Sequence, residues 1–235
     1  MKIMTFNTQH CQNYLDRKIN FDLIAKTITD CDADIIGLNE MRNKGAAEGY
    51  EDQMGILSDL TDIPYCYFAM ATDFGGAKPY GNGLLSRKPI LEATTIPIPT
   101  PSEKQYNGYY EPRCILKAKI AGGITVLVTH FGLNPDEQEN AVKTVLENLE
   151  NEKCILMGDF NLPPESELLD PIRVQMKDTA DLFLDPLHSF PSDLPRIKID
   201  YLFVSKDIKV VAADIPPIVA SDHRPHTATI RVPQR

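Results

Sequence analysis

The chain has 235 residues, 43% of them hydrophobic, which is enough for one large domain with a sizeable core. Its formal net charge of −9 argues against tight sequence-independent binding to duplex DNA, because such binding needs a basic surface. No apolar run reaches the roughly 18 residues of a membrane helix, and the scattered cysteines form no C-x-x-C pair. The first residues enter a strand pattern without the regions of a signal peptide. We therefore expect one cytoplasmic domain over residues 1–235, with no membrane span and with reduced cysteines.

In chain order, the apolar pattern predicts many strands and few helices. Helices are expected at 16–31, 52–60 and 135–151, and the last has a capping pattern because Asn134 precedes Pro135 and lies three residues before Glu137. The segment 96–112 has the composition of a long surface loop. Strands are expected at 2–6, 34–38, 65–69, 83–86, 91–98, 113–120, 125–129, 153–157, 199–204, 209–213 and 227–232. Two packed sheets with helices outside, an α+β fold, accommodate this order.

Polar side chains recur where the predicted strands end. One such residue usually forms a turn or cap with its own backbone. A whole set of them predicts instead that strand ends converge on a shared cleft, held by rigid backbone. The positions are Asn7, Glu40, His130, Asp159, Asn161, Asp200, Asp222 and His223.

The residue types in this set indicate phosphoryl chemistry. The four acids supply oxygen ligands, which suit Mg²⁺ or Mn²⁺ better than zinc. The two histidines can donate hydrogen bonds to phosphoryl oxygens, and the two asparagines can orient water or phosphate without adding negative charge. No Walker-type phosphate loop occurs, which disfavours an NTP-driven motor. The negative net charge does not exclude a nuclease, because a bound cation changes the local field.

The same residues lie in motifs that resemble the endonuclease/exonuclease/phosphatase superfamily, in the family's order and along nearly the whole chain. The motifs are "IMTFNTQ", "ADIIGLNEMR", "GNGLLSRKPI", "EPR", "VTHFGLN", "MGDFNLPPES", "IKIDYLFVS" and "ASDHRPHTATI". The resemblance implies a four-layer αββα sandwich, in which two packed, mostly antiparallel sheets are flanked by helices. It also implies a divalent-metal-dependent hydrolase of phosphoesters.

The resemblance assigns one group of residues to the metal and the phosphate. Glu40 matches the family's main metal ligand, and Asn7 lies beside both metal and phosphate. Asp222 looks like a carboxylate on the metal side, often acting through water. His130 matches a histidine that contacts the phosphate. The expected cofactor is therefore Mg²⁺ or Mn²⁺, with the number of ions left open.

A second group is assigned to the attacking water and its proton. Asp159 matches the carboxylate that activates the water, and Asn161 matches the amide that positions it. Asp200 matches the aspartate that pairs with the family's final histidine, here His223, and can fix its tautomer and favour its charged form. The residues leave open whether Asp159 or His223 takes the proton from water.

Two further residues are candidates for contacts with the substrate. Arg113, in "EPR", is weighed equally as a structural ion-pair partner and as a residue that supports the site. Tyr109 lies in the predicted long loop, where a tyrosine can stack on a base or sugar, although most exposed loop tyrosines only pack locally.

The substrate is less well defined than the reaction. Gln9 occupies a position that is usually acidic in the DNA-repair branch, and the tryptophan motif of the inositol-phosphatase branch is missing, since the chain has no tryptophan. We expect a small bacterial-type member that acts on a small phosphoester or a lipid-like head group. A DNA nuclease of the abasic-site type is the alternative, and a non-catalytic phosphoester-binding protein is the alternative of another class. The sequence carries no information on oligomeric state.

Overall fold

Two six-stranded sheets make up the centre of the fold within residues 1–233, the part that the computed structural model describes. The first sheet has the order β11 (Lys209–Asp214), β12 (His226–Arg231), β1 (Lys2–Asn7), β2 (Ile35–Arg42), β4 (Pro79–Ser86), β3 (Tyr65–Asp73). The second has the order β5 (Ile90–Ile98), β6 (Arg113–Ile120), β7 (Ile124–His130), β8 (Cys154–Asp159), β10 (Asp200–Ser205), β9 (Met176–Asp178). The sheets are mixed, with antiparallel pairs predominating; the parallel pairs are β1–β2 and β7–β8.

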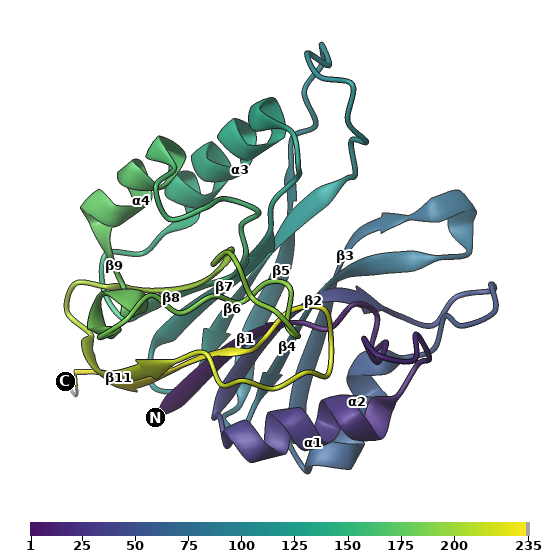
Figure 1. The fold of residues 1–235 in the computed structure, drawn as a ribbon, viewed down its shortest axis with the longest axis horizontal. Coiled ribbons are helices and arrows are strands. Elements are labelled where there is room, and N and C mark those ends of the chain that lie inside the picture. Colours follow the sequence, from purple (N-terminus) through teal and green to yellow (C-terminus); the bar gives the residue numbers. More distant parts are fainter. Residues whose placement is uncertain (234–235) are drawn as a thin grey trace.

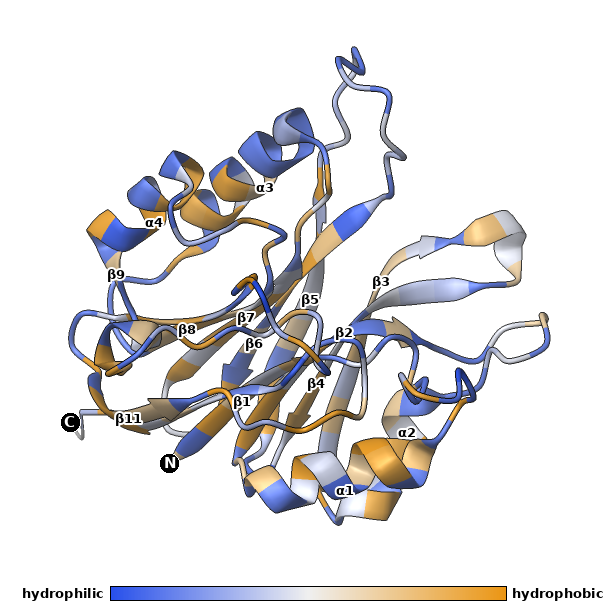
Figure 2. Ribbon diagram, viewed as in Figure 1, coloured by the Kyte–Doolittle hydropathy of each residue, from blue (hydrophilic) through white to orange (hydrophobic). Residues whose placement is uncertain are grey.

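Helices cover the outer face of each sheet, so the layers run helix, sheet, sheet, helix (Figure 1). Helices α1 (Phe21–Cys31) and α2 (Gln53–Thr61) pack on the first sheet, and α3 (Pro135–Asn148) and α4 (Asp170–Gln175) on the second. Each helix carries both polar and apolar residues (Figure 2). Three apolar layers hold the stack together: one between the sheets and one under each pair of helices. The predicted αββα sandwich is therefore confirmed.

The helix ends follow local capping chemistry. The first helix begins at Phe21, later than predicted, because the side chain of Asn20 accepts a hydrogen bond from the Leu23 N–H at 3.0 Å and caps it. The third begins at Pro135 as predicted, with the Glu137 carboxylate accepting from the Asn134 N–H at 3.2 Å. Helix α4 and strand β9, both short, were not predicted from the sequence. Within residues 1–233, no helix has the length and apolar composition needed to cross a bilayer.

The predicted strands are all present, but β2 continues past its predicted end. Asn39 and Glu40 therefore lie inside a strand, at a shift in the pairing register between Leu38 and Met41, where Glu40 adopts a left-handed φ of 60°. A bulge of this kind aims a side chain out of the regular alternation of the strand. The correction matters because it explains how a residue within a buried strand can present its carboxylate to a cleft.

Strand pairing brings the predicted polar residues to one end of the sandwich. In the parallel pairs, Asn7 lies opposite Asn39 and His130 opposite Asp159, while antiparallel β10 places Asp200 opposite Asp159 as well. Gly158 permits this close approach, since a Cβ at that position would lie 1.8 Å from the Thr129 carbonyl oxygen. The convergence expected from the sequence is thus a consequence of sheet register.

Candidate active site

A buried asparagine joins the two sheets beneath the site. Asn39 donates from Nδ2 to the Asn82 Oδ1 atom at 2.8 Å and to the Thr129 carbonyl at 2.9 Å, and its Oδ1 accepts from the Asp159 N–H at 3.0 Å. The first sheet thereby fixes the backbone of a catalytic candidate in the second. Asn39 is not among the candidate residues of the sequence analysis. Its signal was an amide inside an otherwise apolar strand.

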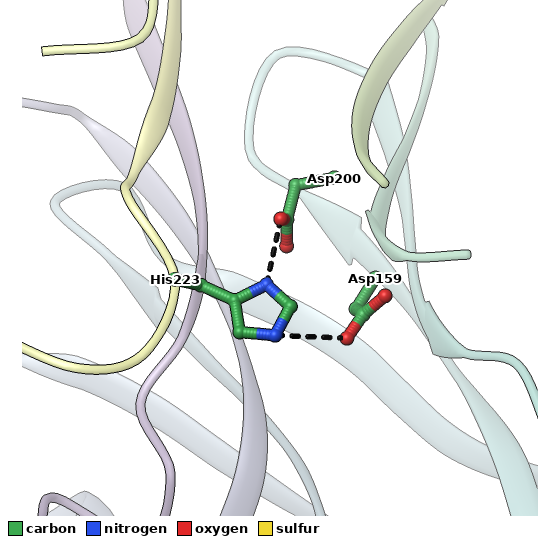
Figure 3. A group of neighbouring side chains, drawn as sticks. All are labelled: Asp159, Asp200 and His223. Atoms are coloured by element: carbon green, nitrogen blue, oxygen red, sulfur yellow. Dashed lines mark hydrogen bonds and ion pairs between the residues drawn. The ribbon is translucent and has the colours of Figure 1, made fainter. Parts of the chain in front are cut away.

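The imidazole of His223 lies between two carboxylates (Figure 3). Its Nδ1 is 2.8 Å from Asp200 Oδ2, and its Nε2 is 3.6 Å from Asp159 Oδ2. Burial opposes a charge on the ring, but the attraction of Asp200 and Asp159 outweighs it and raises the pKa of His223 to about 10. The ring is therefore a cation at neutral pH. Two ligands of one metal ion lie about 3 Å apart or more, so the 2.8 Å contact marks a shared proton rather than a metal.

Asp159 is the most connected carboxylate of the site. Its Oδ2 accepts from Asn7 Nδ2 at 3.0 Å, and its Oδ1 accepts from the Asn161 N–H at 2.9 Å. Burial raises the pKa of Asp159 to about 7, against the lowering effect of the His223 cation. A carboxyl group with that pKa can take up and release a proton near neutral pH.

Arg113 sets the tautomer of His130. The Arg113 guanidinium has no acceptor, so its 2.8 Å contact from Nη1 to His130 Nδ1 requires Nδ1 to accept. The remaining proton of the neutral ring then lies on Nε2, which is 3.4 Å from Asp159 Oδ2. Burial, followed by the charge of Arg113, lowers the pKa of His130 well below its usual value. His130 is therefore a neutral hydrogen-bond donor, and Arg113 acts through it rather than facing the cleft alone.

The amide of Asn161 lies next to this donor. Its Nδ2 donates to the Phe131 carbonyl at 3.0 Å and lies 3.3 Å from His130 Nε2, so that its Oδ1 faces away from both. The backbone is left-handed, with φ of 49°, a conformation that asparagine tolerates better than most residues. Asn161 thus offers an amide oxygen that accepts from no donor in the described part of the chain.

Glu40 and Asp222 form the acidic side of the site. Glu40 Oε1 accepts from Asn7 Nδ2 at 3.2 Å, and Asp222 Oδ2 accepts from Gln9 Nε2 at 3.0 Å. No lysine or arginine of residues 1–233 lies within ion-pair distance of either carboxylate. Burial raises the pKa of Asp222, and the nearby Glu40 charge adds to this. Gln9, noted from the sequence only as a departure, and the Ser221 hydroxyl, which donates to Oδ1 at 3.0 Å, together orient Asp222.

Most of these side chains line one cleft of about 390 Å³. Its lining includes Glu40, Arg113, His130, Asp159, Asn161 and His223, together with residues not predicted from sequence, among them His10, Arg42, Tyr50 and Tyr80. Tyr109 is not brought to this lining: it is 67% exposed, on the loop that projects beyond the sheets between β5 and β6 (Figure 1). The reason is that its backbone carbonyl is fixed by Asn134 at the start of α3, which leaves the side chain in solvent.

Comparison with known proteins agrees with this geometry. Residues 4–223 match the model of the Endonuclease/Exonuclease/phosphatase family. The chain belongs to this family. No curated protein is similar enough in sequence to match it.

Solved structures show that this family member has the family's fold. A Beutenbergia cavernae endonuclease/exonuclease/phosphatase has a TM-score of 0.80 at 21% identity, covering 99% of this chain and 71% of its own. A mannosyl-6-phosphatase of Bacteroides thetaiotaomicron has a TM-score of 0.75 at 16% identity, covering 98% and 99%. A 3′ phosphatase from Neisseria, bound to a product DNA hairpin, has a TM-score of 0.67 at 16% identity, covering 98% and 99%. The structural neighbours thus include a mannosyl-6-phosphatase and a 3′ phosphatase bound to DNA.

Proposed function

We propose that this family member is a divalent-metal-dependent phosphoesterase, which hydrolyses a small phosphoester or a lipid-like head group by in-line attack of water. The observation that carries the proposal is the position of His223, a buried imidazolium between Asp200 and Asp159, in the same cleft as Glu40. A fixed cation, a carboxylate that titrates near neutral pH and an acidic cation site are the parts that phosphoryl transfer to water needs.

The acidic side of the site fits a divalent cation. Glu40 and Asp222 are neighbouring carboxylates that pair with neither lysine nor arginine over residues 1–233, and Glu40 is 23% exposed toward the cleft. Oxygen ligands of this kind suit Mg²⁺ or Mn²⁺, which polarises the phosphoryl oxygens when bound. Asn7 orients Glu40 by donating from its amide nitrogen, and its own oxygen, which accepts from the Gln9 N–H at 3.1 Å, keeps a second lone pair that can bind the same ion.

Asp159 is proposed as the base. A carboxyl group with a pKa near 7 can accept the proton of the attacking water, whereas His223, with its pKa raised to about 10, already carries both of its protons. The Oδ1 atom of Asn161 is free to accept a hydrogen bond from that water. These two pKa values favour Asp159 over His223 as the base, a choice that the residue types alone left open.

The donors of the site face the developing charge. His130 and His223 place their Nε2–H groups 3.4 and 3.6 Å from Asp159 Oδ2, and both can donate to the phosphoryl oxygens as the bond to the leaving alcohol breaks. The leaving oxygen takes its proton from solvent at the mouth of the cleft. Asp200 does not touch the substrate; it holds the ring of His223 in place and stabilises its charge.

The dimensions of the cleft favour a small substrate over duplex DNA. A volume of about 390 Å³ accommodates a phosphorylated sugar or head group, and the chain has a net charge of −9. The similarity to a mannosyl-6-phosphatase supports a phosphomonoester, whereas the similarity to a DNA-bound 3′ phosphatase keeps the DNA end as the competing substrate.

A substrate panel with and without metal tests the proposal. The panel holds p-nitrophenyl phosphate, bis-p-nitrophenyl phosphate, sugar phosphates, sphingomyelin, 3′-phosphorylated single strands and an abasic duplex, each with Mg²⁺, Mn²⁺ or EDTA. We expect EDTA-sensitive hydrolysis, strongest on a small phosphoester. Asp159→Asn and His223→Ala should each lower kcat by at least about 10²-fold.

The same panel separates the alternatives. Preferential cleavage of the abasic duplex would establish the nuclease instead. Tight binding of phosphoesters with no hydrolysis of any of them would show a non-catalytic binding protein. Full turnover by both variants would show that the assigned residues are not the catalytic ones.

A further inference from the structure

His10 lies beside Glu40, and none of the roles described above uses it. Its Nε2 is 3.6 Å from Glu40 Oε2, and both side chains are partly open to the cleft, at 27% and 23% exposure. We propose that His10 is an additional ligand of the cation held by Glu40, and that this imidazole makes the site select Mn²⁺ over Mg²⁺. The inference rests on the metal dependence proposed above and specifies the ion.

The backbone around His10 is strained and firmly held. Gln9, His10 and Cys11 have successive left-handed φ values of 47°, 61° and 60°. Residues in this conformation persist where their surroundings determine them. The His10 carbonyl accepts from Gln53 Nε2 at 2.9 Å, and the Cys11 carbonyl accepts from the Asn20 N–H at 2.8 Å. The turn is therefore built to keep the imidazole at this place.

The hydrogen bond at His10 Nδ1 determines the tautomer of the ring, and so determines whether Nε2 faces the Glu40 carboxylate with a lone pair. His10 Nδ1 is 3.0 Å from the Glu40 carbonyl oxygen, which can only accept, so Nδ1 carries the proton. In the neutral ring, Nε2 is then an acceptor that faces another acceptor, Glu40 Oε2, at 3.6 Å. A cation between the two atoms satisfies both.

The separation of the two acceptors fits a shared ion. Two ligands at ordinary bond lengths of about 2.1 Å can be up to about 4.2 Å apart, and these atoms are 3.6 Å apart. The Nδ1–H bond to a backbone carbonyl is also the usual way in which a metal-binding histidine is oriented. A direct ion pair explains the contact less well, because hydrogen bonds between charged groups are typically about 2.8 Å long.

An imidazole ligand changes which ion the site prefers. Carboxylate and water ligands suit Mg²⁺ and Mn²⁺ alike, whereas an imidazole is a softer ligand that suits first-row transition ions better than Mg²⁺, so between these two ions it favours Mn²⁺. A site built from Glu40, His10 and the nearby Asp222 therefore favours Mn²⁺. This preference follows from one residue that the resemblance to the family did not single out.

The decisive measurement is pulsed EPR of the protein loaded with Mn²⁺ alone, which detects ¹⁴N coupling from a bound imidazole. We expect this coupling in the wild type and its loss in His10→Asn, a replacement chosen because asparagine tolerates the left-handed backbone. His10→Ala serves as a second variant, and His188→Ala, which removes a histidine that makes no hydrogen bond in the described chain and lies outside the cleft, is the matched control. Melting temperatures confirm that each variant is folded.

Titration calorimetry with Mn²⁺ and with Mg²⁺ gives the second readout. We expect His10→Asn and His10→Ala to weaken Mn²⁺ binding at least about 10-fold, while Mg²⁺ binding changes less than about 3-fold. Coupling that is absent from the wild type, or that survives both replacements, overturns the inference, and so does an equal loss for the two ions. Because these readouts do not use turnover, metal-dependent hydrolysis with unchanged Mn²⁺ binding in His10→Asn would leave the proposed function standing and remove only the role of His10.

Discussion

Two imidazoles face carboxylates in the same cleft, yet their surroundings give them opposite properties. His223 has a carboxylate at each nitrogen and is buried, and these charges overcome burial and raise its pKa. His10 has a backbone carbonyl at one nitrogen and Glu40 at the other, and burial, opposed by Glu40, lowers its pKa. One neighbouring carboxylate is therefore not enough to keep a buried histidine protonated. His223 has a second carboxylate, whereas His10 has a backbone carbonyl in that place. His223 holds a proton, and His10 keeps a lone pair for a cation.

Replacing Asp200 by asparagine is expected to have the largest effect, since it removes one of the two charges that hold the proton on His223. The variant Asp200→Asn should lower kcat by about 10³-fold, because the ring loses both its charge and its fixed orientation. Steady-state kinetics on the best substrate of the panel measure this. Asp59→Asn, at an exposed position on α2, is the control for a lost carboxylate. A loss below tenfold would mean that the pair is structural.

Removing the Glu40 carboxylate tests whether the cation binds next to His10. Glu40→Gln keeps the size and hydrogen-bonding capacity of the side chain but removes a metal ligand, so Mn²⁺ affinity should fall by about 10²-fold. Calorimetry measures the affinity directly, and activity should recover partly at high Mn²⁺. Unchanged affinity would show that the ion binds elsewhere. His10 could then not be assigned as a ligand of an ion held by Glu40.

We expect the hydrogen bonds that Asn39 makes between the two sheets to contribute strongly to the free energy of unfolding. Asn39→Leu removes three hydrogen bonds and leaves buried partners in both sheets unsatisfied, so the free energy of unfolding should fall by on the order of 3 kcal/mol. Chemical denaturation gives the value. Because the Asp159 N–H loses its acceptor, kcat should fall as well. A stable variant with full activity would show that the sheets position the site without Asn39.

A lysine buried near Asp200, Lys198, should make the stability of the protein depend on pH. Lys198 lies 3.5 Å from Asp178, and burial lowers its pKa from 10.5 to about 8. Between these two values the unfolded chain binds the proton more strongly, so wild-type stability should rise with pH relative to Lys198→Met, by on the order of 2 kcal/mol. Urea unfolding from pH 7.5 to 10.5 measures this, with exposed Lys26→Met as the control. Parallel profiles for wild type and Lys198→Met would contradict it.

The sequence indicated the residues whose own side chains suggest chemistry, and it did not indicate residues such as Asn39 that contact a neighbour across the two sheets. The αββα layers follow from apolar periodicity and from the family motifs, and the structure brings Glu40, Asp159, Asp200 and His223 together at one end. The strand bulge at Glu40 leaves no trace in that periodicity.

The missed residues act through contacts between segments far apart in the chain. Asn39 reaches Asp159 and Gln9 reaches Asp222, so their contacts appear only once the strands are paired. The position of His10 beside Glu40 depends on a left-handed turn, which a pattern of residues does not reveal. Tyr109, a residue type suited to stacking, lies in solvent away from the cleft lining, and its contact with substrate stays a prediction.

The most direct test of the account is a crystal structure of the protein with Mn²⁺ and inorganic phosphate, with the metal located by its anomalous scattering. We expect one Mn²⁺ peak within bonding distance of Glu40, and phosphate oxygens that accept hydrogen bonds from His223 and His130. Phosphate bound outside this cleft, or Mn²⁺ between Asp159 and Asp200 with Glu40 unoccupied, would contradict it.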